Sequence, residues 1–197
     1  MASLFDTLQA NAFRAGITAR TKESQKWFQD NIESLKMPAR QALLKDKSLE
    51  PTSKMIYGNM FMYFYDPKHK KTLPYYDRFP LTIMVDANKT GFQGLNLHYL
   101  RPDIRAEFLD RLMKLGPDNI TDKSRLTKLR YDLISSTKKY KEFRPCFKSY
   151  LNEHVRSRIV RVPMTEWEIA VFLPTEQFKK AGKAKIWKES ISAARKR

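Results

Sequence analysis

Three aspartates in the middle of the chain, Asp66, Asp77 and Asp86, are of the type that a metal-dependent nuclease gathers around a divalent ion. Each aspartate also has a structural explanation. Asp66 precedes Pro67 and suits the start of a turn. Asp77 suits a cap or an ion pair with Arg78, and Asp86 suits the start of a hairpin. We favour the structural roles and therefore predict no metal site, no cofactor and no catalytic residue, with a nuclease as the alternative.

The histidines and the single cysteine are not spaced as metal ligands. His69, His98 and His154 are far apart, and none has a partner at ligand spacing. His98 lies in an apolar run and is predicted to be a core histidine, whereas His69 lies in the run KHKK and is predicted to face solvent. Cys146 is flanked by aromatic residues and is predicted to be buried. A Walker-type phosphate loop and a Gly-rich dinucleotide turn are both absent. These features favour a binding protein over an enzyme.

The chain is strongly basic. Its formal net charge is +17, from 38 Lys and Arg against 21 Asp and Glu. An excess of this size predicts a polyanionic partner, with nucleic acid favoured over an anionic membrane or an acidic protein surface. The last 19 residues hold 8 basic side chains and 1 acidic one, and residues 123–161 hold 12 basic and 3 acidic. No apolar run reaches the length of about 18 residues that a membrane span requires.

We predict that basic side chains in these two regions bind DNA phosphates. Such contacts act through counterion release, which is strong, salt-dependent and indifferent to base sequence. Interleaved aromatic residues, such as Tyr140, Phe143 and Trp187, can stack on exposed bases at a strand end. The predicted contacts are Lys138, Lys139, Lys141, Arg144, Lys148, Arg156, Arg158, Arg161, Lys179, Lys180, Lys183, Lys185 and Lys188. A basic loop within KHKKTLPYYDRF supplies the further candidates Lys68, His69, Lys70, Lys71 and Arg78.

The elements that must position these residues centre on the aromatic-rich segment 60–100. Short apolar runs separated by Pro, Asp and Gly predict strands at 60–65, 81–85 and 92–97, and a fourth strand is expected at 159–162. Short antiparallel strands joined by long irregular loops are typical of a small SH3-like β-barrel or of a curled antiparallel sheet.

Helical periodicity surrounds this sheet. Helices are expected at 5–16, 21–37, 39–45, 102–115, 121–135 and 143–155, with a linker at 46–54. Thr165 and Glu168 form a capping-box pattern that predicts a helix at 166–172, although WEIAVFL also fits a strand. Thr175 is expected to cap a basic C-terminal helix. The predicted class is α+β, with an N-terminal helical arm (1–54), an α+β core with a central helical insertion (55–178) and a basic C-terminal tail (179–197).

Several phrases of the sequence carry a resemblance to a known family. They are MFMYFYDPKHKKTLPYYDRFPL, GFQGLNLHYL with RPDIRAEFLDRL, and FRPCFKSYLNEHVRSRIVRVP with EWEIAVFLP. Together they resemble a virion protein family of large contractile-tailed bacteriophages, that of the proteins labelled DNA end protector. The resemblance covers about residues 55–178 and extends to the N-terminal phrase NAFRAGITARTKESQKWF. It brings no catalytic residues with it.

The resemblance implies a non-enzymatic virion protein, assembled in the host cytoplasm, that binds the terminus of packaged DNA near the portal, neck or tail. There it would shield the end from host exonuclease. The implied partners are the double-stranded DNA end and other virion proteins of the portal, neck or tail, with no membrane. A different function also fits: a structural tail, baseplate or neck protein whose helical arms and basic tail dock on neighbouring subunits.

Overall fold

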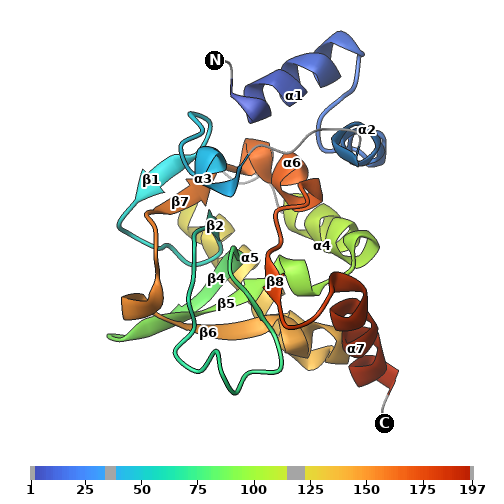
Figure 1. Ribbon diagram of the computed structural model, residues 1–197. Helices are drawn as coiled ribbons and strands as arrows, with labels where there is room; N and C mark the ends of the chain where they lie inside the picture. Colours follow the sequence, from blue (N-terminus) through green and yellow to red (C-terminus); the bar gives the residue numbers. More distant parts are fainter. Residues whose placement is uncertain (1–2, 34–38, 115–122, 196–197) are drawn as a thin grey trace.

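The computed structural model describes residues 3–33, 39–114 and 123–195 of the chain (Figure 1). At its centre lies a six-stranded antiparallel sheet with the strand order β1-β7-β2-β4-β5-β6. Its strands are β1 (Glu50–Thr52), β2 (Met60–Met62), β4 (Leu81–Ala87), β5 (Gly91–Asn96), β6 (Phe147–Leu151) and β7 (Ile159–Val162). A separate two-stranded sheet pairs β3 (Tyr76–Asp77) with β8 (Phe178–Lys179).

The main sheet is open, with β1 and β6 as its two edges among the described strands. The α+β class is confirmed, and an antiparallel sheet is observed in place of the SH3-like barrel. Closure would require hydrogen bonds between the two edge strands. β1 is only three residues long and pairs with β7 alone, while β6 pairs with β5 alone. The predicted strands correspond to β2, β4, β5 and β7, whereas β1 lies inside the predicted linker.

The sheet is apolar on both faces, because side chains alternate along β2 between two buried clusters. Met60 and Met62 join the larger cluster, and Phe61 joins the smaller one. The larger cluster also takes residues from α1 (Leu4–Arg14), α2 (Lys22–Glu33), α3 (Arg40–Leu43), α4 (Pro102–Lys114), α5 (Lys123–Ser136), α6 (Trp167–Phe172) and α7 (Lys183–Arg195). The smaller cluster is aromatic and includes Tyr63, Tyr65, Phe92 and Tyr150. Burial on both faces makes this sheet the rigid centre of the molecule.

The helix predicted over 143–155 is wrong. This segment forms a 3-10 helix (Lys141–Cys146), the edge strand β6 and a second 3-10 turn (Asn152–His154). Pro145 cannot donate a hydrogen bond inside an α-helix. In addition, β6 pairs with β5 along its whole length, from Leu95↔Phe147 to Gly91↔Leu151. The tertiary pairing therefore overrides an apolar spacing that had looked helical.

The C-terminal segment also departs from the prediction. Thr175 does not cap a helix: β8 follows it, and α7 begins only at Lys183. The predicted helix at 166–172 is present as α6, but Glu168 makes no capping hydrogen bond there. In α7, Ile186 is fully buried and Trp187 Nε1 donates to the His98 carbonyl at 2.9 Å. These contacts pack the basic helix against the body of its own chain. No helix within the described ranges is long and apolar enough to cross a membrane.

Candidate nucleic-acid interface

Two predicted DNA contacts bond to the edge strand β1 and to the segment that precedes it. The Arg158 guanidinium donates to the Leu44 carbonyl, and Arg161 Nε donates to Glu50 Oε2 at 2.8 Å. Arg161 and Glu50 are also opposite one another in the β1–β7 register. Because Glu50 neutralises Arg161, this side chain has less charge to offer a phosphate than the sequence suggested. Arg158 remains exposed.

Lys180 fastens the basic loop that joins β2 to β3. Its Nζ donates to the carbonyls of Lys71 (2.7 Å) and Leu73 (2.8 Å). Its own backbone is left-handed, with φ at 69°, so the chain turns sharply as it leaves β8. Within the loop, Lys70 pairs with Asp66 at 2.8 Å, and this hydrogen bond lowers the pKa of the Asp66 carboxyl. The loop is therefore held by an ion pair between two of its own residues and by hydrogen bonds from the residue that follows β8.

The remaining predicted contacts differ in how far their own chain neutralises them. Lys183 pairs with Glu176 at 2.8 Å, and Lys185 lies 4.0 Å from Glu189. Lys138 Nζ donates to Gln93 Oε1 at 3.0 Å and stands 5.3 Å from the centre of the Phe147 ring. Lys141 and Arg78 are half-buried, whereas Lys68, His69, Lys70 and Lys71 are exposed. Five further cations are exposed and have no carboxylate at ion-pair distance among the described residues: Lys139, Arg144, Arg156, Lys179 and Lys188.

The basic loop and the edge strand β6 enclose a cavity of about 400 Å³, which we call the loop cavity. Figure 1 shows the loop between β2 and β3 extending below β6. Six of the fifteen lining residues are Tyr or Phe, and the basic side chains of the lining come from the loop and from β6. The lining residues are Tyr65, Pro67, Lys68, His69, Leu73, Tyr75, Tyr76, Asp77, Asn96, Tyr99, Phe147, Lys148, Ser149, Tyr150 and Leu151. The structure thus brings Lys68, His69 and Lys148 together, which lie in two separate basic regions of the sequence.

Lys148 is the most unusual of these cations. Its Nζ stands 4.2 Å from the centre of the Tyr99 ring. Burial lowers the pKa of the Lys148 ammonium, and no carboxylate pairs with it in the part of the chain that the structure describes. Loss of water disfavours a charged group, and a nearby opposite charge restores it. The cation therefore favours an anion entering the loop cavity.

The floor of the cavity is held by a buried network around Asp77. Asp77 Oδ2 lies 2.6 Å from His98 Nδ1, and His98 Nε2 lies 3.1 Å from Thr175 Oγ1. Asp77 Oδ1 accepts from the backbone N–H groups of Phe79 and Gln177, both at 3.0 Å. Burial opposes ionisation of Asp77, but His98 and these N–H groups hold its pKa below the usual range. The predicted capping role of Asp77 is thus observed at the Phe79 N–H, whereas no ion pair with Arg78 occurs among the described residues. The predicted core position of His98 is confirmed.

The order Asp77, His98 and Thr175 resembles a nucleophile with its base and orienting acid. Here the arrangement is structural, because His98 and Thr175 are 0% and 1% exposed and no substrate reaches the hydroxyl. Its effect is to fasten the segment before β8 to the end of β5. The three predicted carboxylates are also not brought together: Asp66 pairs with Lys70, Asp77 is buried and Asp86 is exposed on β4. No group of three or more metal-ligating side chains occurs among the described residues.

The aromatic wall of the loop cavity was not predicted from the sequence. Tyr150 is its central residue, with its ring 4.9 Å from Tyr65 and 5.2 Å from Phe92 between centroids. Asn96 Nδ2 donates to the Tyr150 hydroxyl and to Asp77 Oδ2, both at 3.2 Å. A Cβ on Gly91 would overlap the Tyr150 carbonyl oxygen, so glycine is needed where β5 meets β6. The wall is thus fixed before any ligand binds.

The aromatic residues predicted to stack on bases lie elsewhere. Tyr140 is 53% exposed, Phe143 is buried, and Trp187 is half-buried with its N–H bonded to its own chain. Cys146 is buried as predicted, and burial raises the pKa of its thiol to about 12. The sequence signal that could have indicated the cavity is YYDRF between two prolines, an irregular segment with more aromatic residues than a solvent loop needs.

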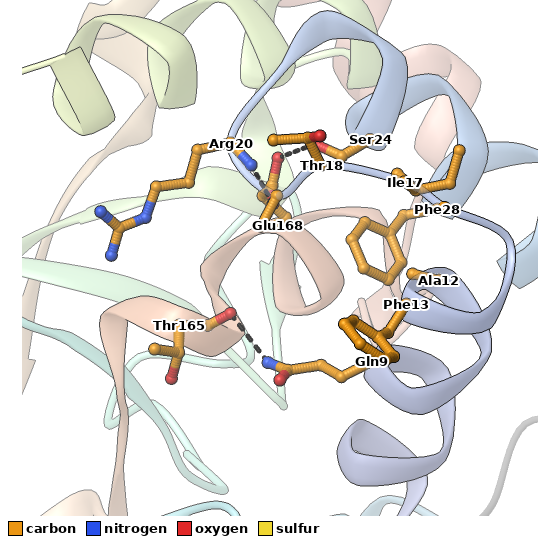
Figure 2. Close-up of a pocket in the computed structure, with 12 residues that line it drawn as sticks. Gln9, Ala12, Phe13, Ile17, Thr18, Arg20, Ser24, Phe28, Thr165 and Glu168 are labelled. Carbon is orange, nitrogen blue, oxygen red and sulfur yellow. Dashed lines mark hydrogen bonds between the residues drawn. The ribbon is translucent and has the colours of Figure 1, made fainter.

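A second hollow, of about 610 Å³, lies between α1, the turn after it and α6, and we call it the N-terminal hollow (Figure 2). Figure 2 shows Glu168 reaching the Arg20 backbone and Ser24. Glu168 accepts from Arg20 N at 3.0 Å and from Ser24 Oγ at 2.6 Å. Gln9 Nε2 donates to the Thr165 carbonyl at 3.1 Å across the same hollow. Two charged side chains, Arg20 and Glu168, line this hollow. The buried carboxylate of Glu168 already accepts hydrogen bonds from its own chain, and a negative charge at this position does not suit a phosphate.

Comparison with protein families places the chain in a known family. A family model described as Phage T4 terminal DNA protecting protein matches residues 1–191. No curated protein and no solved structure matches the chain at a significant level. The family match spans the N-terminal helices, the sheet and most of α7, and it confirms the resemblance found in the sequence. The chain belongs to the phage T4 terminal DNA protecting protein family.

Proposed function

We propose that this protein binds the terminus of double-stranded DNA without base-sequence preference and shields it from host exonuclease. The observation that carries this proposal is the match of residues 1–191 to a family whose description names terminal DNA protection. The net charge of +17 supplies the attraction to phosphate that such binding requires. A protein can protect a DNA end by remaining bound to it, without catalysing a reaction, since an exonuclease must reach the terminal nucleotide before it can cut.

The arrangement of cations around the loop cavity supports binding at this side of the molecule. Lys68 and His69 are exposed on the loop, and Arg156 and Lys139 are exposed on segments that flank β6. Arg156 is close to the loop, because its backbone N–H donates to the Phe64 carbonyl at 2.8 Å. Together with Lys148 they form a surface that can follow the phosphates of a DNA end.

We further propose that the protein acts inside the virion, near the portal, neck or tail, after assembly in the host cytoplasm. The phage family supports a virion location. Its partners there would be the DNA end and other virion proteins. The end of the packaged genome becomes exposed to host enzymes once the DNA leaves the particle.

An exonuclease protection assay tests the proposal. Linear duplex DNA is incubated with the purified protein, challenged with a double-strand exonuclease and compared with unprotected DNA over a salt series. We expect protection that falls steeply with salt, since six to ten phosphate contacts lose about 10³–10⁵-fold in affinity between ~50 and ~200 mM. Digestion at the same rate with and without protein at ~50 mM salt would overturn the proposal.

One observation favours the second function, a structural protein of the tail, baseplate or neck. Phe13 is 84% exposed beside the N-terminal hollow, a large apolar side chain at a place where a neighbouring virion subunit could dock. In that case Phe13→Ser would prevent incorporation into particles and leave DNA protection intact. Normal incorporation of this variant would exclude docking through Phe13.

A further inference from the structure

We propose that the loop cavity receives the unpaired terminal nucleotide of a DNA strand, with its base against the aromatic wall and its phosphate at Lys148. This inference rests on the proposed function and names the part of the DNA end that is recognised. It concerns a step that the surface cations cannot perform. Phosphate contacts are the same along a duplex as at its terminus, so they give affinity without preference for an end.

The size and lining of the cavity fit a nucleotide. Its volume of about 400 Å³ lies within the usual range for small-molecule sites, which are mostly apolar with a few placed polar groups. Tyr75, Tyr76 and Phe147 are half-buried, so part of each side chain remains accessible, while Tyr99 and Tyr150 are almost wholly buried behind them. Aromatic side chains of this kind bind single-stranded bases by stacking, whatever the base.

The charge in the cavity fits a phosphate. The half-buried Lys148 ammonium stands over the Tyr99 ring and pairs with no carboxylate among the described residues. Charge-assisted hydrogen bonds to phosphate strengthen where water is excluded. Lys68 and His69 at the rim are exposed and can meet the next phosphate of the same strand. The one carboxylate in the lining, Asp77, is turned to His98, Asn96 and two backbone N–H groups.

The cavity admits an end but not the middle of a duplex. A base within a duplex is paired and stacked on both sides, and extruding it costs free energy. A terminal base is stacked on one side only and frays more easily. The buried network beneath the cavity also keeps the aromatic wall in place, so little ordering is required on binding. Preference for ends follows from these two properties.

The experiment measures the affinity of the full chain for two labelled duplexes that each carry one unpaired terminal nucleotide. The nucleotide is intact in one duplex and abasic in the other, so that the phosphate is kept and only the base is removed. For the unaltered protein, we expect the abasic end to bind about tenfold more weakly, which is the usual size of one base–aromatic stack. A covalently closed circle of the same sequence should bind more weakly still.

Two cavity variants and one matched control complete the test. Phe147→Leu keeps an apolar side chain in β6 and removes the ring, and Lys148→Met keeps the length of the side chain and removes the charge. With Phe147→Leu, the intact and abasic ends should bind alike; with Lys148→Met, both ends should weaken and approach the affinity of the circle. Lys139→Met lies outside the cavity lining and should weaken all three DNAs equally.

The outcomes separate this inference from the proposed function. Equal binding of intact ends, abasic ends and circles by the unaltered protein, with exonuclease protection retained, would overturn the nucleotide cavity and leave the proposed function standing. Loss of affinity in Lys139→Met equal to that in both cavity variants, on every DNA, would do the same. If the protein binds none of the three DNAs at low salt, the proposed function itself would be overturned.

Discussion

The loop cavity and the N-terminal hollow contrast in chemistry more than in size. Helix α1, which lines the N-terminal hollow, lies at the opposite end of the molecule from β6 and the basic loop, which line the loop cavity (Figure 1). The N-terminal hollow is larger, at about 610 Å³, but its buried carboxylate, Glu168, accepts hydrogen bonds from its own chain. The loop cavity is smaller, at about 400 Å³, but its half-buried cation, Lys148, stands over an aromatic ring without a carboxylate partner among the described residues. In this molecule, a charge without a partner is therefore a better indication of a ligand site than cavity volume is.

The largest expected effect comes from removing the buried carboxylate beneath the loop cavity. Asp77→Ala should lower the free energy of unfolding by about 3–5 kcal/mol, because it leaves His98 and two backbone N–H groups without their acceptor. The pKa of Asp77 is depressed in the folded chain, so its contribution is complete at neutral pH and is lost as pH falls through that pKa. Urea denaturation at pH 7 measures the change. Asp77→Asn, which keeps the shape, is the control and should cost less; equal stability of all three proteins would show that the network does not support the cavity.

A smaller effect is expected from the corresponding change in the N-terminal hollow. Glu168→Gln should cost about 1–3 kcal/mol, because an amide replaces the carboxylate that accepts from Ser24 and from the Arg20 backbone. DNA affinity should be unchanged. Denaturation and a DNA titration on the same preparation check both statements. A loss of DNA affinity in the folded variant would contradict the separation of the two hollows.

The next expected effect depends on pH. Burial raises the pKa of Glu166 to about 7, and its Oε1 accepts from Gln9 in α1 at 2.9 Å. Since the folded pKa lies above the unfolded one, this group contributes stability that is complete below about pH 4.5 and is lost as pH rises through about 7. The melting temperature should therefore decline between pH 5 and pH 8 more in the unaltered protein than in Glu166→Gln. Parallel melting curves for the two proteins across this range would contradict the prediction.

The smallest effect is expected at Phe13, which lines the N-terminal hollow and is 84% exposed. Phe13→Ser should change the free energy of unfolding by less than about 0.5 kcal/mol, since little apolar area is buried there. Exonuclease protection should also be unchanged. Ala12→Ser, one residue earlier on the buried face of α1, is the matched control and should be clearly destabilising. If Phe13→Ser impaired exonuclease protection, DNA would contact the N-terminal hollow, which contradicts the proposed binding at the loop cavity.

The sequence predicted the elements that depend on local pattern and missed those that depend on distant partners. The strands at 81–85 and 159–162 and the helix at 102–115 follow from short-range apolar spacing and are present as β4, β7 and α4. β6 was predicted as a helix because its pairing with β5 joins residues more than 50 positions apart. The same limit applies to the candidate site. Lys148 was predicted to lie in a helix at 143–155, whereas the edge strand β6 places it in a cavity.

Charge alone could not separate structural cations from available ones. Arg161 and Lys148 are both basic residues in basic surroundings, and both were predicted to contact DNA. The partner that neutralises Arg161 is Glu50, 111 positions away, and the ring beneath Lys148 is Tyr99, 49 positions away. The residues of the aromatic wall come from four separate segments. Only folding brings these groups together, so the positive regions could be predicted but the cavity could not.

The position of β7 in the sheet has a consequence for synthesis of the chain. β1 and β2 are neighbours in sequence, yet β7 lies between them and pairs with both. A nascent chain therefore carries the apolar residues of β2 without one of their two strand partners until Val162 has been made. Lys180, whose Nζ bonds to two carbonyls of the basic loop, is synthesised later still. Incomplete chains expose an unpaired apolar strand edge, so premature termination should yield aggregates and not a shorter functional protein.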